Sequence, residues 1–218
     1  MNTTKYAMRL YAVTDSSWLR GRSLAKMVEE AILGGATFVQ LREKELDQEA
    51  FIALAKEVKQ VTSRYHVPFV INDNVEVALA VNADGVHVGQ EDMAAAKARQ
   101  LLGPDKIIGV SCKTPEQAKK AQADGADYIG TGAAFATTTK KDTRALSREE
   151  LQAVAEAVDI PVVAIGGINA GNLLELSGCG VDGVAVVSAI FAQDDPRAAA
   201  EELRALSDQM VADRKSVV

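Results

Sequence analysis

The sequence predicts an α/β protein built as a single compact (β/α)8 barrel, the TIM-barrel architecture. Short runs rich in Val and Ile alternate with amphipathic stretches of helical period. Eight such runs occur, and no Pro-rich or Ser-rich linker separates them. The length of 218 residues suits a compact version of an architecture that typically takes about 250 residues. We therefore expect one domain over residues 1–218, with a loose tail from about residue 211.

The expected strands are short apolar runs, in several places introduced by Gly, Pro or Asp. Residues of this kind favour turns, whereas the β-branched residues within the runs favour strands. In chain order, the predicted strands are 8–13, 37–41, 69–72, 85–88, 106–110, 127–130, 162–165 and 183–187.

Helices are predicted where apolar residues recur on one face. Ser23 and Gly34 supply a start and a stop signal for the first. A last helix is expected near 196–210. The apolar faces are Leu24, Met27, Val28, Ala31 and Ile32 in the first helix, Phe51, Leu54, Ala55, Val58 and Val61 in the second, and Leu151, Val154, Ala155 and Val158 in a later one.

A weak internal repeat supports a closed barrel. The segments GGATFV, NADGVHV, DGADYIG and GVDGVAV introduce every second strand, and Thr37, Asp84, Asp127 and Asp182 lie 47, 43 and 55 residues apart. Four copies of a double βα unit would close into eight strands. An open doubly wound sheet also alternates strands and helices. The count of eight and the lack of GxGxxG after the first strand favour the barrel.

Composition excludes several classes of partner. The chain has 24 Lys and Arg against 30 Asp and Glu, a formal net charge of -6, which is the wrong sign for nucleic acid or an anionic membrane. Cys112 and Cys179 are too few for a disulfide framework and are predicted to be free thiols. No stretch of about 18 apolar residues occurs. We expect a cytoplasmic protein without nucleic-acid or membrane partners; apolar outer helices are compatible with a homodimer.

Basic residues follow the second predicted strand. Gln40, Arg42 and Lys44 are spaced by two and would point to one side if the strand continued that far. Taken alone, LREKELD is also compatible with a solvated charge run. Because barrel active sites form at the carboxyl ends of the strands, and acids follow the next two strands, the position favours anion binding.

Two carboxylates follow neighbouring strands. Asp73 comes after the third and Asp92 after the fourth, and adjacent strands lie about 4.8 Å apart. Separately, Asp73 fits a turn and Asp92 a helix cap. Together, beside Arg42 and Lys44, they favour a Mg²⁺ site, because Mg²⁺ takes one or two carboxylates and completes its shell with water and phosphate. A diphosphate is the anion expected there.

Two further segments indicate phosphate binding. The glycine pair 166–167 and the run VVSAI follow the seventh and eighth strands, where barrels often bind phosphate through backbone amides. A glycine pair also makes a simple tight turn. The segment 131–147, which contains Thr137, Thr138, Thr139 and Lys140, is long for a βα connection and fits either a lid over phosphates or a mobile polar loop.

These motifs resemble the thiamine phosphate synthase family, whose members are also called thiamine-phosphate pyrophosphorylases. The resemblance covers nearly the whole chain, through YAVTD, VQLREK, VIND, ADGVHVGQED, IGVS, TGAAFATTTK, AIGGI and GVAVVSAI. Family members are (β/α)8 barrel transferases that join 4-amino-2-methyl-5-(diphosphooxymethyl)pyrimidine to 4-methyl-5-(2-phosphoethyl)thiazole and release diphosphate. The family loop usually reads TGPxFPT, whereas Ala133 and Ala136 replace its prolines here.

The resemblance implies a role for each site residue. Arg42, Lys44, Ser111 and Lys140 would act in catalysis, and one Mg²⁺ per site would be bound by Asp73 and Asp92. The pyrimidine diphosphate would contact Gln40, Leu41, Arg42, Glu43, Lys44, Asn72, Ser111 and Lys140. The thiazole phosphate would contact Thr137, Thr138, Thr139, Gly167, Val187 and Ser188.

The implied mechanism is dissociative: diphosphate leaves first, and the thiazole nitrogen then attacks the pyrimidine cation. Two alternatives stay open. A related branch of thiazole tautomerases has a histidine shortly after the serine of the fifth strand, where Lys113 stands here. A catalytically silent phosphate-binding barrel would need no pair of magnesium ligands.

Overall fold

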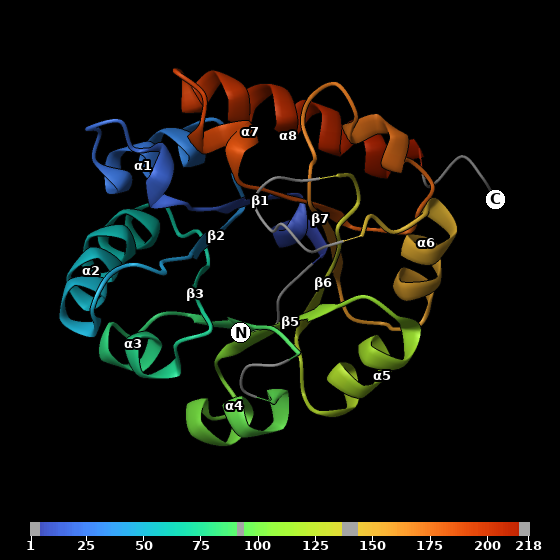
Figure 1. The fold of residues 1–218 in the computed structure, drawn as a ribbon, viewed down its shortest axis with the longest axis horizontal. Coiled ribbons are helices and arrows are strands. Elements are labelled where there is room, and N and C mark those ends of the chain that lie inside the picture. The colour runs from blue at the N-terminus through green and yellow to red at the C-terminus, as the bar shows by residue number, and fades with distance from the viewer. Residues whose placement is uncertain (1–4, 91–93, 137–143, 214–218) are drawn as a thin grey trace.

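Eight parallel strands close into one barrel in the computed structural model, which describes residues 5–90, 94–136 and 144–213. The strands follow one another around the ring from β1 to β8, and β8 pairs with β1. Helices surround the ring on its outside (Figure 1). This closed order confirms the predicted fold class and excludes the open doubly wound sheet.

The strand bounds agree with the predicted ones to within one or two residues. The first strand starts later than expected because Lys5–Met8 forms a 3-10 helix, η1. Ser111, expected after the fifth strand, lies inside it. The strands are β1 Leu10–Val13, β2 Phe38–Leu41, β3 Phe69–Asn72, β4 Gly85–Val88, β5 Ile107–Cys112, β6 Tyr128–Gly132, β7 Val162–Ile165 and β8 Gly183–Val186.

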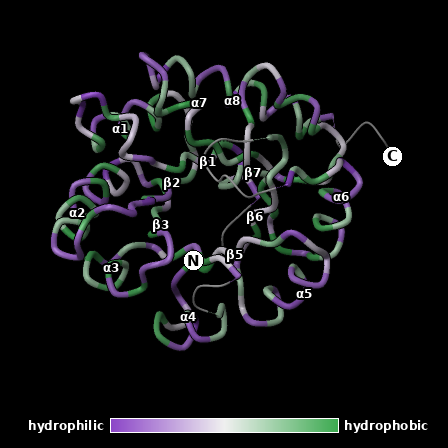
Figure 2. The backbone as a smooth tube through the Cα atoms, viewed as in Figure 1, coloured by the Kyte–Doolittle hydropathy of each residue, from purple (hydrophilic) through white to green (hydrophobic). Residues whose placement is uncertain are grey.

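The helices turn their apolar faces towards the strands, as the alternation of colours along each outer helix illustrates (Figure 2). The Ser23 side chain caps the first, as predicted, by accepting a hydrogen bond from the Lys26 amide. They are α1 Leu24–Leu33, α2 Gln48–Arg64, α3 Val75–Ala80, α4 Ala95–Leu102, α5 Pro115–Ala123, α6 Arg148–Glu156, α7 Ser188–Phe191 and α8 Pro196–Ala212, with the 3-10 turns η2 Ser16–Trp18 and η3 Leu173–Leu176.

Two details of the helices differ from expectation. Val158, placed by its spacing on the apolar face of the α6 region, lies beyond the end of α6 at Glu156. The last helix continues to Ala212, so residues 211 and 212 are helical although the tail was expected to start at about 211. Between β7 and β8, the connection contains the short turn η3 in place of a full helix.

Side chains alternate between the inside and the outside of the barrel, as the two-residue period of a strand requires. Outward residues pack against the helices in one large apolar cluster that includes Leu10, Val39 and Ile71. Inward residues form a second, smaller cluster. It contains Met8, Tyr11, Val13, Phe38, Val70, Ile107, Tyr128, Val163 and Ala185.

The sequence repeat has a structural basis at the amino ends of the strands. Thr37, Asp84, Asp127 and Asp182 each accept a hydrogen bond from a backbone amide in the strand before. The donors are the amides of Leu10, Phe69, Ile108 and Val162, at 2.9, 2.8, 2.8 and 3.0 Å. The repeat therefore stabilises the amino ends of the strands. The active site is expected at the opposite, carboxyl ends.

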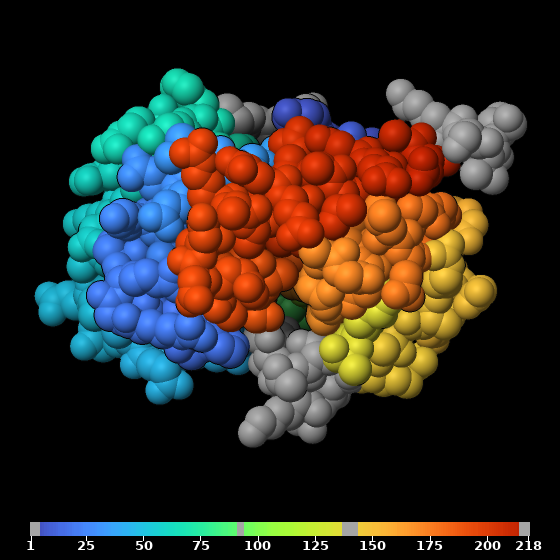
Figure 3. All heavy atoms as spheres, turned by 90° about the horizontal axis from the view of Figure 1, so that it is seen from above, coloured from blue at the N-terminus to red at the C-terminus, as the bar shows by residue number. Residues whose placement is uncertain are grey.

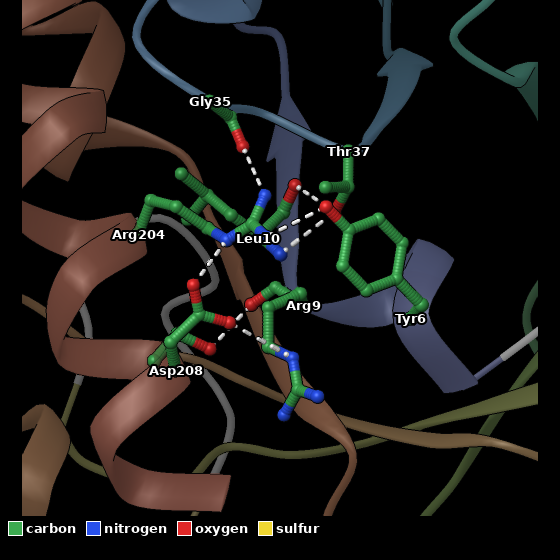
Figure 4. A network of polar contacts seen from close by, with 8 residues as sticks. Tyr6, Arg9, Leu10, Gly35, Thr37, Arg204 and Asp208 are labelled. Atoms are coloured by element: carbon green, nitrogen blue, oxygen red, sulfur yellow. Dashed lines mark hydrogen bonds and ion pairs between the residues drawn. The ribbon is translucent and has the colours of Figure 1, made fainter.

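The last helix, α8, contacts the first strand and the residues before it. Figure 3 shows the red elements of the C-terminal part lying directly against the blue N-terminal ones. At the base, Asp208 of α8 pairs with Arg9 at 3.2 Å and with Arg204 at 2.8 Å (Figure 4). The Arg204 guanidinium also donates to the Gly35 carbonyl and to the Tyr6 hydroxyl. These contacts join both ends of the described chain across the closure of the barrel.

One glycine inside the barrel carries a stability prediction. A Cβ added at Gly109 would lie 2.0 Å from Cζ of Tyr128, whereas one at Gly130 would lie 3.2 Å from Cε1 of His87. We expect Gly109→Ala to lower the free energy of unfolding by about 1–3 kcal/mol through overpacking, and Gly130→Ala to lower it less. Urea denaturation of the two variants measures the difference. Equal effects would show that the Tyr128 ring has room to move.

Candidate active site

The inward-facing residues at the carboxyl ends of β2 to β5 are polar. Gln40, Asn72, His87 and Ser111 occupy these positions, and the strand register places Asn72 beside His87. Below them the interior is filled by apolar and tyrosine side chains. All four line a cavity of about 800 Å³ at this end of the barrel. This cavity lies at the carboxyl ends of the strands, where the sequence predicts the active site.

Positive and polar groups meet in one corner of this cavity. A small hollow of about 50 Å³ is lined by Arg42, Lys44, Asn72, Asp73 and Ser111, together with His87 and Gly89. The strand β2 ends at Leu41, so the predicted two-residue alternation does not continue through Arg42 and Lys44. Both nevertheless line the hollow. This corner can bind an anion through two cations and a hydroxyl.

Arg42 is fixed in this corner from the β1 side. Its guanidinium lies 3.5 Å from the carboxylate of Asp15, and its backbone amide donates to the Thr14 hydroxyl at 3.1 Å. Only 13% of the Arg42 side chain is exposed. Because these partners hold the side chain before any ligand arrives, Arg42 is preorganised to bind an anion.

Asp73 is the one described residue of the predicted metal pair, since Asp92 lies outside the described residues. Its backbone has a φ of 60°, a conformation that Asp tolerates better than most residues. Its amide donates to the His87 carbonyl at 2.8 Å, and its carboxylate accepts from the Asn72 side chain at 2.5 Å. Within the described residues, no group of three or more His, Cys, Asp or Glu could hold a metal ion.

The opposite wall is formed by the glycine pair and the end of β8. Gly166 and Gly167 have φ of 106° and 66°, and a Cβ at Gly167 would lie 2.4 Å from the Ala136 carbonyl oxygen. The Asn172 side chain donates to the Gly167 carbonyl at 2.9 Å and so holds this turn. Gly167, Val187 and Ser188 line the same cavity as Arg42. Thr137, Thr138, Thr139 and Lys140 lie outside the described residues.

Two residues of the predicted diphosphate set point elsewhere. The Leu41 side chain is fully buried in the apolar cluster between barrel and helices, because it is an outward-facing strand residue. The Glu43 carboxylate accepts hydrogen bonds from the Ser16 hydroxyl of η2 and from the Lys44 and Glu45 amides of its own loop. Neither side chain lines the cavity among the described residues. Glu43 organises the loop that carries Lys44.

The thiols offer no nucleophile. Cys112 and Cys179 are both free and buried. Burial raises the pKa of the Cys112 thiol to about 12, so it stays protonated at neutral pH. Lys113, the next residue, lines the cavity, and its backbone amide donates to the Gln117 side chain at 2.7 Å.

Sequence reasoning missed a buried polar chain beneath the site. Tyr11 and Tyr128 are fully buried inside the barrel and their hydroxyls lie 2.7 Å apart. Nδ1 of His87, which had no predicted role, lies 2.9 Å from the Tyr128 hydroxyl, and its Nε2 lies 2.9 Å from Oγ of Ser111. The signal available in the sequence was Gly109, because glycine inside a strand often marks the close approach of another group.

Comparisons with known proteins identify relatives of this chain along most of its length. Two curated proteins named thiamine-phosphate synthase are each 52% identical to this chain. The match with the protein of Clostridium tetani extends over 194 residues and covers 89% of this chain and 93% of that protein. The match with the protein of Alkaliphilus oremlandii extends over 196 residues and covers 90% of this chain and 94% of that protein. The solved thiamine phosphate pyrophosphorylase of Pyrococcus furiosus superposes with a TM-score of 0.87 at 40% identity, covering 95% of this chain and 98% of that one.

Two further findings complete the comparison. None of the helices in the described ranges is both long enough and apolar enough to cross a membrane. The model of a family described as thiamine monophosphate synthase matches residues 10–190, and the strands that carry the polar corner and the glycine pair fall within that range. On these matches, the chain belongs to the thiamine monophosphate synthase family.

Proposed function

We propose that this chain is a transferase that couples 4-amino-2-methyl-5-(diphosphooxymethyl)pyrimidine to 4-methyl-5-(2-phosphoethyl)thiazole, giving thiamine phosphate and diphosphate. The observation that carries the proposal is the joint lining of one cavity by Arg42 and Asn72 on one wall and by Gly167 and Ser188 on the other. A cavity of about 800 Å³ is within the range of small-molecule sites and has room for two substrates. The names of the relatives support the same activity.

Within this proposal, the polar corner binds the leaving diphosphate. Arg42 and Lys44 neutralise the charge that grows on the departing oxygen, and the Ser111 hydroxyl adds a hydrogen bond. Lys140, outside the described residues, is proposed to act with them. The glycine-pair wall holds the thiazole phosphate through backbone amides near Gly167 and Ser188. Holding the two rings in line makes the attack effectively unimolecular.

The donor set of the corner also fits Mg²⁺. Asp73 contributes a carboxylate beside two cations, an oxygen donor of the kind that this ion prefers, and Asp92 is proposed as the second. Bound there, the ion would neutralise charge on the diphosphate oxygens. The Asn72 amide holds the Asp73 carboxylate in place through its hydrogen bond.

The direct test is incubation with both substrates, with and without Mg²⁺, while diphosphate release is followed. We expect release that needs both the thiazole phosphate and Mg²⁺. Release without Mg²⁺ would contradict the metal assignment alone. Isomerisation of the thiazole without diphosphate release would instead show a tautomerase, and binding without turnover a silent barrel.

We also propose a cellular compartment and an oligomeric state for the protein: the cytoplasm and a homodimer. Both cysteines are free and buried, which suits the reducing cytoplasm. Leu79 of α3 and Leu101 of α4, two neighbouring outer helices, are each 50% exposed, which is compatible with a homodimer. Sedimentation velocity measures this assembly; a monomer at all concentrations would contradict it.

A further inference from the structure

A chain of hydrogen bonds runs inside the barrel from β2 to the polar corner. It joins side chains from five different strands, in the order Gln40, Tyr11, Tyr128, His87 and Ser111. Successive donor–acceptor distances are 2.6, 2.7, 2.9 and 2.9 Å. Tyr11 and Tyr128 are buried, and Ser111, at the end of this chain of hydrogen bonds, lines the polar corner of the cavity.

The barrel makes room for this chain at two strand positions. A Cβ at Gly109 would overlap the Tyr128 ring, and a Cβ at Gly130 would press on the His87 ring. The three aromatic rings of Tyr11, Phe38 and Tyr128 pack edge to face, with centroids 4.6 to 5.8 Å apart. These contacts restrain the rings and so favour the hydroxyl partners described above.

The direction of the chain follows from its first donor. The Gln40 side-chain nitrogen donates to the Tyr11 hydroxyl. Either tyrosine oxygen could be the donor in the Tyr11–Tyr128 hydrogen bond, but among the described hydrogen bonds Tyr128 is the partner left for the Tyr11 proton, so donation from Tyr11 to Tyr128 pairs every donor. With its oxygen accepting from Tyr11, the Tyr128 hydroxyl pairs its own proton by donating to Nδ1 of His87, an arrangement in which Nδ1 carries no proton. Burial raises the pKa of both phenols, so at neutral pH each keeps the proton that this requires.

We propose that this directed chain holds His87 as the neutral Nε2–H tautomer, so that the Ser111 hydroxyl accepts from His87 and donates its own proton into the cavity. Resting on the proposed function, the acceptor is an oxygen of the substrate's diphosphate. His87 is thus a positioning residue. A hydroxyl oriented in advance as a donor stabilises developing negative charge without a reorganisation cost at the moment of reaction.

The tautomer can be measured in the ligand-free protein. The chain has two histidines, and His66, exposed after α2, serves as a reference imidazole in the same sample. We expect long-range ¹H–¹⁵N correlation spectra of protein with ¹⁵N-labelled histidine to show a proton on Nε2 of His87 and none on Nδ1. A proton on Nδ1, alone or with one on Nε2, would overturn the proposal.

Two phenylalanine variants test the effect on the reaction. Tyr128→Phe keeps the ring but removes the donor to His87; we expect kcat to fall about tenfold while KM for the thiazole phosphate stays unchanged. The double variant with Tyr11→Phe should lose no more than Tyr128→Phe alone, because Tyr11 acts only through Tyr128. Losses of kcat that add in the double variant would show that each tyrosine acts through packing, and would contradict the directed hydrogen bonds. Tyr65→Phe, which removes a hydroxyl bonded to Glu29 outside the barrel, is the matched control.

The outcomes separate this inference from the proposed function. If the protein has the Nε2–H tautomer of His87 but releases no diphosphate, the directed hydrogen bonds are supported and the proposed function is contradicted. An Nδ1–H tautomer in active protein overturns the inference and leaves the function standing. Unchanged kcat in a folded Tyr128→Phe variant likewise overturns the effect on Ser111.

Discussion

Arg42→Ala is expected to lower kcat/KM for the pyrimidine diphosphate by about 10²–10³, the loss typical for removing one preorganised group that stabilises transition-state charge. Most of the loss should appear in kcat, because the charge on the leaving oxygen grows during the reaction. Arg42→Lys should retain more kcat/KM than Arg42→Ala but less than the parent, since an ammonium lacks the planar, two-pronged guanidinium group. Steady-state rates of diphosphate release measure both variants.

Two controls separate this role from indirect effects. Removing Arg42 leaves the Asp15 carboxylate, 3.5 Å from the guanidinium, without this partner near the diphosphate site. If repulsion from Asp15 caused the loss, the double variant Asp15→Asn with Arg42→Ala would regain the activity; we expect it not to. Arg64→Ala removes an exposed arginine of α2 paired with Glu29 and should change nothing. If Arg42→Ala keeps the kcat/KM of the parent protein, Arg42 has no part in the mechanism.

Asp73→Asn should reduce Mg²⁺-dependent turnover by about 10²-fold and raise the Mg²⁺ concentration needed for half-maximal activity. The change removes a charge but keeps the shape of the side chain, and an amide is a weaker ligand for a hard cation. Titration of Mg²⁺ in the diphosphate-release assay measures both effects. Asp92→Ala is expected to behave alike if the two acids share one ion.

Binding of the thiazole phosphate alone provides the complementary readout for Asp73→Asn. It should be unchanged, because Gly167 and Ser188 lie on the other wall of the cavity. Asp159→Asn, which changes an exposed aspartate before β7, is the matched control. An Asp73→Asn variant with the parent's Mg²⁺ dependence would show that this carboxylate does not bind the ion.

The fold could be predicted because each level of the sequence agreed with it. Strand runs such as 69–72, 85–88 and 162–165 were bounded by strong turn signals, and the structure gives the same bounds. Two strand ends moved outward because tertiary pairing extends β5 and β6 past their local signals: Ser111 and Cys112 of β5 pair with Gly130 and Thr131 of β6. Local patterns contain no information about such pairing partners.

The candidate site was predictable where a side chain's direction follows from strand alternation and its chemistry from its type. Gln40, Asn72 and Ser111 meet both conditions. The side chains of Leu41 and Glu43 do not line the cavity, because Leu41 is the outward neighbour of an inward residue and the loop carboxylate of Glu43 turns towards nearby amides. For the buried hydrogen bonds of Tyr128 and His87, the sequence offered only the indirect signal of Gly109. The partners themselves were not predictable, because Tyr128 and His87 resemble ordinary strand residues until the register brings them together at Gly109.

The base of the barrel has a consequence for how the protein is made. Ribosomes deliver β1 first, yet β1 bonds to β8, and its neighbour Arg9 needs Asp208 of the final helix. A nascent chain that has emerged only as far as β7 therefore carries two unpaired strand edges and a cationic group without its acid. We expect those edges to be open to aggregation until β8 and the last helix have emerged and the barrel closes.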